Sequence, residues 1–202
     1  MTLWLADKPL VLASKSETRR RMLKAAGLPF QVKPADIDER ALEKRMTGGS
    51  PRMVAAALAR EKAIAVSRKM PGRFVIGADQ TLALGKRRFS KPRNRAEARA
   101  QLQALSGKTH ELFSAVAIAR DGQALSTRTA SARMTMRRLS KPFTERYLDE
   151  AGSAVTKSVG GYQIEGLGIH LFERIEGNYF TILGLPLLPL VDYLRRSKLI
   201  AE

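Results

Sequence analysis

Short apolar segments alternate with amphipathic ones along the chain. Residues 10–13 and 74–78 are almost entirely apolar, which is typical of strands buried on both faces of a sheet. Residues 30–32 predict a further short strand, and residues 112–119 and 130–136 alternate as sheet strands do. The polar residues that follow the first apolar segment predict that the chain leaves the sheet at Ser14.

Four other segments carry apolar residues at helical spacing, namely 17–26, 51–70, 95–105 and 144–150. The first is followed by Gly27, which we expect to be its C-cap. The second begins at Ser50, a typical N-cap, with Pro51 as its first residue. Residues 180–194 read as a buried strand or loop that enters a helix. Strands and helices that alternate in this way indicate an α/β or α+β protein.

Composition narrows the classes of protein further. The chain has 202 residues, of which 44% are hydrophobic and 27% charged, as in globular proteins, and this length fits one domain, with or without two lobes. The absence of cysteine excludes a disulfide scaffold, a thiolate metal site and a cysteine nucleophile. No apolar run reaches the roughly 20 residues of a membrane helix. We therefore expect a cytoplasmic protein that does not bind membranes.

The charge is strongly unbalanced. Lys and Arg number 36 against 19 Asp and Glu, which gives a net charge of +17 at neutral pH. Such a charge favours polyanionic partners, namely nucleic acids, nucleotides or acidic membranes, but does not choose among them.

Residues 14–21 are a candidate anion site, because they follow the first strand and open a helix. A helix N-terminus offers unpaired N–H groups, and Ser and Arg add donors that suit phosphate. The alternative is an N-cap serine followed by a solvated basic turn. The segment is not a P-loop, and the Gly-Lys-Thr at 107–109 has Leu102 where that motif requires its first glycine.

Acidic residues are scarce in this basic chain, so their positions are informative. Asp79 is expected at the end of the strand 74–78, where it could ligate Mg²⁺, take a proton from water or only form a turn. Asp36, Asp38 and Glu39 form a cluster after residues 30–32. Carboxylates beside a phosphate site need a bridging cation, so a divalent metal is expected unless the cluster is a solvated loop.

Several further residues have two readings each. Lys62 in a helix and Lys91 in a loop could balance phosphate charge or be surface lysines. The four glycines within residues 160–168 indicate tight turns or close approach of the backbone to a ligand. His110 and His170 are isolated in the sequence and are expected to be packing or surface residues.

Taken together, these segments resemble the Maf family of nucleoside triphosphate pyrophosphatases. Each matching motif is modest, but together they occur in one order over nearly the whole chain. The motifs lie at residues 12–14 with 19–20, 36–39, 60–63, 76–79, 91–92, 105–110, 161–168 and 184–187.

The resemblance implies an α/β fold of the inosine triphosphatase type. It implies a single domain over residues 1–202, with an elongated mixed sheet flanked by helices and two lobes around a central cleft. The implied reaction hydrolyses a nucleoside triphosphate, often a non-standard one, between its α and β phosphates to a monophosphate and pyrophosphate. A divalent cation (Mg²⁺, Mn²⁺ or Co²⁺) and a homodimer are also implied.

By matching positions, the resemblance implies roles for particular residues. Asp79 would be the general base and, with Glu39, a metal ligand. The phosphate-binding set would be Ser14, Arg19, Lys62 and Lys91.

Three positions, Thr18, Gln80 and Glu165, correspond to the family's substrate-specificity residues. Gln80 and Glu165 resemble the branch that acts on 7-methyl-GTP, whereas Thr18 stands where that branch tends to have an aromatic residue. Glu165 could accept hydrogen bonds from the N1–H and 2-amino groups of a guanine. We therefore expect a modified or purine nucleotide.

A nucleic-acid-binding protein with a role in division or septum formation, as the family's name suggests, is the second hypothesis, and it rests on the net charge. A dedicated binder would often interleave aromatic residues with its basic ones, but aromatics are only 6% of this chain. The enzyme is therefore the favoured reading.

Overall fold

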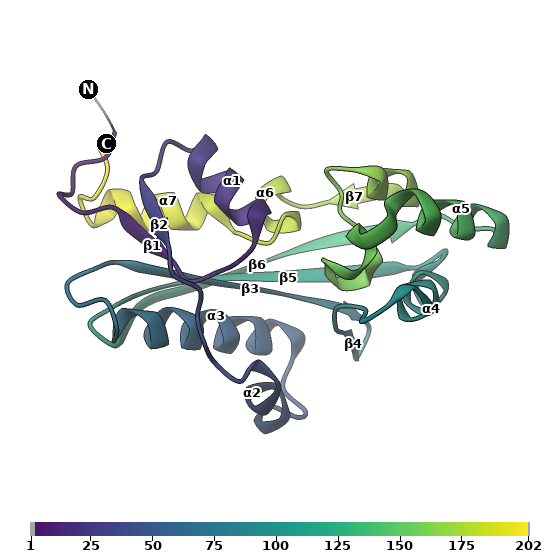
Figure 1. Cartoon of the computed structure of the whole chain (residues 1–202), viewed down its shortest axis with the longest axis horizontal. Coiled ribbons are helices and arrows are strands. Elements are labelled where there is room, and N and C mark those ends of the chain that lie inside the picture. The colour runs from purple at the N-terminus through teal and green to yellow at the C-terminus, as the bar shows by residue number, and fades with distance from the viewer. Residues whose placement is uncertain (1–2, 202) are drawn as a thin grey trace. The chain divides into compact units, whose positions relative to one another are not determined.

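A computed structural model describes residues 3–201 and contains one mixed sheet with flanking helices (Figure 1). The strand order is β2-β1-β3-β5-β6-β7, and β4 pairs with β3. Strand β1 is parallel to β2 and β3, whereas β4 and β7 are antiparallel to their partners β3 and β6. The strands are β1 Leu10–Leu12, β2 Phe30–Val32, β3 Val75–Leu84, β4 Arg87–Phe89, β5 Thr109–Arg120, β6 Gln123–Met136 and β7 Phe172–Glu176. The expected α/β class is confirmed.

The helices lie between these strands in the sequence. They are α1 Glu17–Ala25, α2 Glu39–Arg45, α3 Pro51–Ser67, α4 Arg95–Leu105, α5 Lys141–Ala151, α6 Tyr179–Ile182 and α7 Leu187–Arg196. Three 3₁₀ segments follow α5, at Gly152–Thr156, Val159–Gly161 and Leu167–Leu171. No helix within residues 3–201 combines the length and the apolar character that crossing a membrane requires.

The chain divides into two compact units. The first takes in Met1–Gln80, Phe113–Ala130 and Tyr179–Glu202, and the second takes in Thr81–Leu112 and Ser131–Asn178. Each unit therefore combines segments that are distant in the sequence.

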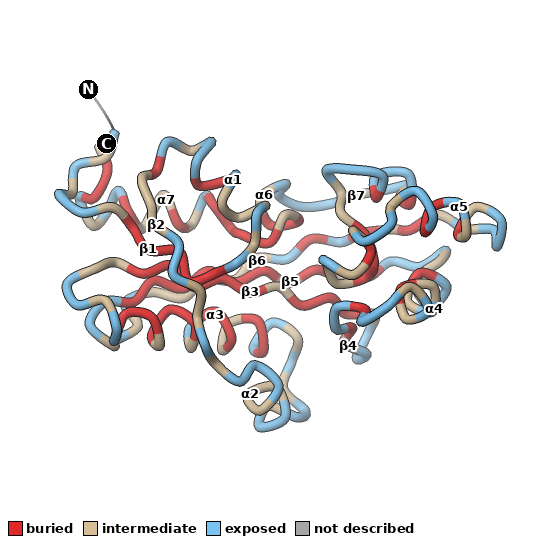
Figure 2. Tube along the Cα trace, viewed as in Figure 1, coloured by how far each residue is buried: buried red, intermediate tan, exposed pale blue. Residues whose placement is uncertain are grey.

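In the first unit, helices cover both faces of the sheet (Figure 1). On one face, α1 and α7 bury leucines and Met22 against Leu10, Leu12, Ile76 and Ile118. On the other face, α3 packs against the sheet, and Figure 2 shows its inward side buried. The residues in contact there are almost all alanines, at positions 55, 59, 63, 115, 117 and 119. Small side chains allow α3 to approach the strands closely.

Gly77 lies at a point of very close approach between β3 and α3. A Cβ at this position would lie 2.1 Å from the Ala59 carbonyl oxygen and 2.7 Å from the Ala63 nitrogen. Since successive residues of a strand face opposite sides, Val75, Gly77 and Asp79 face α3, while Ile76 and Ala78 face α1 and α7. The glycine thus allows the next residue on its side, Asp79, to lie beside α3.

The second unit contains a cluster of rings, in which Tyr162 and Phe172 lie beside His110. His110 is 1% exposed, and its Nε2 forms a hydrogen bond of 2.7 Å with the Tyr162 hydroxyl. Burial lowers the pKa of His110 to about 4, so this histidine is a neutral packing residue, as expected. A Cβ on Gly160 would meet Tyr162 and Leu82 at 2.6 and 2.7 Å. Gly160 therefore approaches the protein's own side chains, which supports the tight-turn reading of this segment.

Several sequence predictions are confirmed. Strand β2 and helix α4 have the predicted bounds. Helix α3 starts at Pro51, and the side chain of Ser50 accepts a hydrogen bond from the Met53 N–H as its N-cap.

Other predictions are wrong. The strand predicted over 74–78 does not end at Asp79 but continues to Leu84. The C-cap residue of α1 is Ala26 and not Gly27, although Gly27 does end the helix: it has φ 66°, and the Leu28 N–H bonds across it to the Leu23 carbonyl. The acidic cluster is not only a loop, because α2 begins at Glu39. Residues 180–194 contain no strand, and the alternative prediction of a loop that enters a helix holds in part, because a turn after α6 leads into α7.

Candidate active site

A buried pair of opposite charges joins β3 to α3. The Lys62 ammonium donates a hydrogen bond of 2.6 Å to Oδ1 of Asp79, and both residues are 8% exposed. The surface reading of Lys62 is therefore wrong. Charged groups are rarely buried without a partner, so each of these two requires the other.

Glu39 extends this pair to a triad. Asp38 caps α2 by accepting a hydrogen bond of 2.9 Å from the Ala41 N–H, and this cap starts the helix at Glu39. Glu39 Oε2 lies 2.9 Å from Lys62 Nζ. One ammonium group thus bridges two carboxylates, one buried on β3 and the other half-exposed on α2.

The surroundings tune the acidity of Asp79. Burial raises the pKa of the Asp79 carboxyl above its usual range, the charges of Lys62 and Arg19 oppose that rise, and Glu39 adds to it. A carboxylate with a raised pKa accepts a proton more readily at neutral pH than an exposed aspartate. Asp79 therefore has the environment expected of a general base.

Arg19 lies where the parallel pairing of β1 with β3 ends. The last backbone bond between these strands runs from Ala13 N–H to the Ile76 carbonyl, at 2.8 Å. The next carbonyl on that edge belongs to Ala78, and it accepts a hydrogen bond of 2.8 Å from Arg19 Nη1. The carboxyl end of a parallel strand is where ligands bind in α/β proteins.

Two further contacts orient the Arg19 guanidinium. Its Nη1 donates to Ser14 Oγ at 3.1 Å, and its Nε donates to the Gly184 carbonyl at 2.9 Å. Ser14 is 8% exposed, and its Oγ also accepts from the Ser16 N–H at 3.2 Å. Ser16 is the N-cap of α1, so the capping alternative holds for Ser16, whereas Ser14 contacts the arginine.

The first unit therefore holds most of the predicted site residues. Ser14, Arg19, Glu39, Lys62 and Asp79 are linked through the contacts above, and Thr18 lies half-buried in the first turn of α1. Lys91 and Glu165 belong to the second unit, where both are exposed.

Gln80 departs from the expected arrangement, because it points to the opposite face of β3 from Asp79. Its Nε2 donates to Ser114 Oγ and to the carbonyls of Thr181 and Ile182, at 3.0 to 3.1 Å. Sequence reasoning did not single out Ser114. The signal that could have found it is a lone hydroxyl within the otherwise apolar face of residues 112–119.

The residues that could hold a metal ion are few. No group of three or more His, Cys, Asp or Glu side chains converges within residues 3–201. Asp79 and Glu39 form a pair of carboxylates, and Mg²⁺ is commonly held by one or two carboxylates together with substrate phosphates. The donor set therefore fits a cation that arrives with a polyphosphate.

In α/β proteins, phosphate groups commonly bind where a parallel strand ends and a helix begins, so this arrangement of Arg19 and Asp79 suits a phosphate-bearing ligand. The family to which the chain belongs is the Maf-like proteins, whose model matches residues 9–197.

Curated relatives match over the full length of the chain. A protein of Rhodopseudomonas palustris strain BisB18 is 57% identical over 201 residues, and one of Bradyrhizobium diazoefficiens is 58% identical, each covering 100% of both chains. Both are named nucleoside triphosphate pyrophosphatase. A protein of Brucella abortus named 7-methyl-GTP pyrophosphatase is 55% identical and covers 95% of this chain and 97% of its own length.

Proposed function

We propose that this chain is a nucleoside triphosphate pyrophosphatase that hydrolyses the bond between the α and β phosphates. The observation that carries the proposal is the buried Lys62–Asp79 pair, which places a carboxylate of raised pKa next to Arg19. The names of the full-length relatives support the same activity.

The cationic residues bind the triphosphate in this proposal. Arg19 and Lys62 offer charged N–H donors to phosphate oxygens, and Ser14 adds a hydroxyl. Lys91, an exposed lysine of the second unit, is the fourth proposed phosphate ligand. Positive groups held in place in this way stabilise the charge that develops on the phosphoryl oxygens.

Asp79 acts as the general base. A water molecule loses one proton to the Asp79 carboxylate while its oxygen bonds to a phosphorus of the α–β bridge. The bond from that phosphorus to the bridging oxygen breaks. The products are a nucleoside monophosphate and pyrophosphate. General-base catalysis of this kind is worth roughly 10²- to 10⁴-fold in rate.

Asp79 and Glu39 are the residues that would hold a divalent cation. Such a cation, bound together with the triphosphate, supplies charge neutralisation at the phosphate oxygens. Lys62 already bridges the two carboxylates, and it keeps their negative charges from repelling the substrate.

For the base, we propose a modified purine nucleotide such as 7-methyl-GTP. Glu165 is exposed and could accept hydrogen bonds from a guanine edge. Thr18 and Gln80 are the other two proposed specificity positions, and the 55% identical Brucella relative named 7-methyl-GTP pyrophosphatase supports this preference.

A nucleotide panel tests the proposal. The full-length protein is incubated with 7-methyl-GTP, GTP, dTTP, UTP and 5-methyl-UTP in Mg²⁺ or Mn²⁺, and the products are resolved by ion-exchange chromatography. We expect monophosphate and pyrophosphate in equal amounts, with fastest turnover of 7-methyl-GTP. Release of diphosphate and inorganic phosphate would contradict the assigned bond, and a strong preference for dTTP would contradict the assigned base.

A further inference from the structure

A second polar network lies on the face of β3 opposite to Asp79. Gln80 is the next residue of the strand, so its side chain points toward α1, α6 and α7. Its Nε2 lies 3.0 Å from Ser114 Oγ, 3.1 Å from the Thr181 carbonyl and 3.0 Å from the Ile182 carbonyl. An amide nitrogen has only two N–H donors, so three acceptors commit it fully to the protein's own groups.

Ser114 completes this network from strand β5. It is 0% exposed, and its Oγ donates to the Thr181 carbonyl at 2.6 Å while accepting from Gln80. Its neighbours on the same face, Val116 and Ile118, belong to the apolar core. A buried hydroxyl is costly unless it is hydrogen-bonded, so Ser114 is a position where bonding outweighs apolar packing.

The network holds the turn that follows α6. The Thr181 carbonyl also accepts from the Gly184 N–H at 3.1 Å, and Gly184 adopts φ 91°, which a side chain would strain. The Gly184 carbonyl in turn accepts the Arg19 Nε–H at 2.9 Å. A Cβ on Gly184 would lie 3.5 Å from both Arg19 Nη2 and Gln80 Oε1, so the two side chains flank this residue.

We infer that Gln80 and Ser114 are positioning residues for the phosphate-binding guanidinium of Arg19. They fix the turn from Thr181 to Gly184, and that turn sets the direction of the guanidinium. The inference rests on the proposed function, in which Arg19 binds the triphosphate. This positioning role differs from the contact with the nucleotide base that the resemblance implies for Gln80.

A ligand without a base separates these two tasks. Inorganic tripolyphosphate presents the phosphate oxygens alone, so a residue that only contacts the base does not affect its binding. We expect Ser114→Ala and Gln80→Met to weaken tripolyphosphate binding roughly 3- to 10-fold each, which is the range that one net hydrogen bond contributes. Isothermal titration calorimetry on the full chain measures this affinity, with the exposed Ser153→Ala as the matched control.

A double-mutant cycle tests whether the effect passes through Arg19. In an Arg19→Met background, Ser114→Ala should weaken binding no further, because the group that it positions is gone. Additive losses would overturn the inference, since they would mean that Ser114 acts by another route. Ser114→Thr, which keeps the hydroxyl, should restore most of the affinity, and Gln80→Glu replaces Gln80→Met if the latter fails to fold.

Failure of the inference and failure of the proposed function give different results. If Arg19→Met leaves tripolyphosphate binding unchanged, the proposed phosphate-binding role of Arg19 is wrong. If Arg19→Met weakens binding but the Ser114 and Gln80 variants do not, only the positioning role is wrong. A Gln80 variant that changes the preference among nucleotide bases while tripolyphosphate binding stays constant would establish a base contact instead.

Discussion

Replacing Gly77 with alanine should disturb both the packing of α3 and the candidate active site. The new Cβ would lie 2.1 Å from the Ala59 oxygen and 2.7 Å from the Ala63 nitrogen, and ordinary van der Waals contact begins near 3.4 Å. Both neighbours are backbone atoms, which have no rotamer that avoids the contact. Either α3 or β3 must therefore move by roughly 1 Å, a displacement large enough to disturb a close-packed core.

The cost follows from this displacement. Overpacking a core costs about 1–3 kcal/mol, and the fixed backbone places this variant near the upper value. For a chain of this size each kcal/mol lowers Tm by about 2–4 °C, so a fall of roughly 6–12 °C is expected. The same movement would stretch the 2.6 Å bond between Lys62 and Asp79, and misplacement by about 1 Å can reduce turnover about 100-fold.

Differential scanning calorimetry and pyrophosphate release measure the two effects on one preparation. Gly166→Ala is the matched control for stability, since its Cβ would meet nothing closer than the Gln163 oxygen at 3.9 Å. We expect the control to melt within about 2 °C of the wild type, as surface substitutions do. If Gly77→Ala also melts within that range and retains full activity, the close approach of α3 to β3 does not exist.

Three further predictions concern charge. The pKa of His110 is about 4 in the folded protein and 6.5 in the unfolded chain, so the free energy of unfolding should fall by about 3 kcal/mol as the pH falls from 6.5 to 4. Urea unfolding measures this free energy, and in His110→Gln it should depend less steeply on pH over that range. The general base must be deprotonated to act, and Lys62 lowers the pKa of Asp79. Lys62→Met should therefore move the acid limb of the pH profile of kcat/KM to higher pH, whereas Lys69→Met, a change at an exposed lysine, should not move it. Chelation by EDTA should abolish turnover, and Glu39→Gln should raise the Mg²⁺ concentration needed for half-maximal activity, measured by metal titration.

Local signals in the sequence predicted the elements whose ends are set by local chemistry. Ser50 and Pro51 start α3, and Asn94 caps α4, so both helices begin where the pattern indicates. Helix α2 was missed because it is only seven residues long and buries none of them. Its start depends on the Asp38 cap, which a solvated acidic loop resembles in sequence.

The candidate site residues were predicted from the order of motifs and not from hydrophobic patterning. Patterning places Lys62 among the polar positions of its helix, because its burial depends on Asp79 and Glu39 from other segments. The strand was expected to end at Asp79 because patterning likewise does not show the partners that Asp79 has in other segments. It continues because Asp79 and Gln80 each have partners, the former on α3 and the latter on β5 and α6. Such long-range pairing leaves no local signal.

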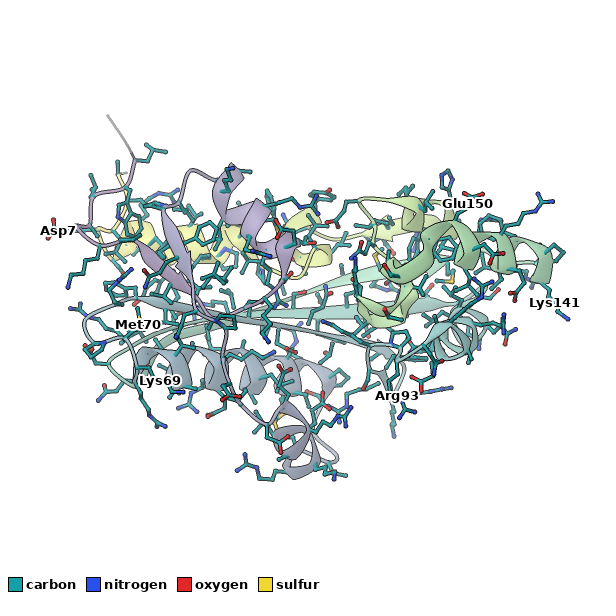
Figure 3. All side chains as sticks on the ribbon, viewed as in Figure 1. Asp7, Lys69, Met70, Arg93, Lys141 and Glu150 are labelled. Atoms are coloured by element: carbon teal, nitrogen blue, oxygen red, sulfur yellow. The ribbon has the colours of Figure 1, made fainter. Side chains whose placement is uncertain are left out.

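The central claim is that Asp79 is the base that activates water. Pyrophosphate release from 7-methyl-GTP by Asp79→Asn tests it most directly, with Asp7→Asn as the matched control, an exposed carboxylate labelled in Figure 3. We predict that kcat/KM of Asp79→Asn falls by at least about 100-fold, as expected for loss of a general base, while Asp7→Asn equals the wild type. A folded Asp79→Asn variant that retains wild-type turnover would contradict the account.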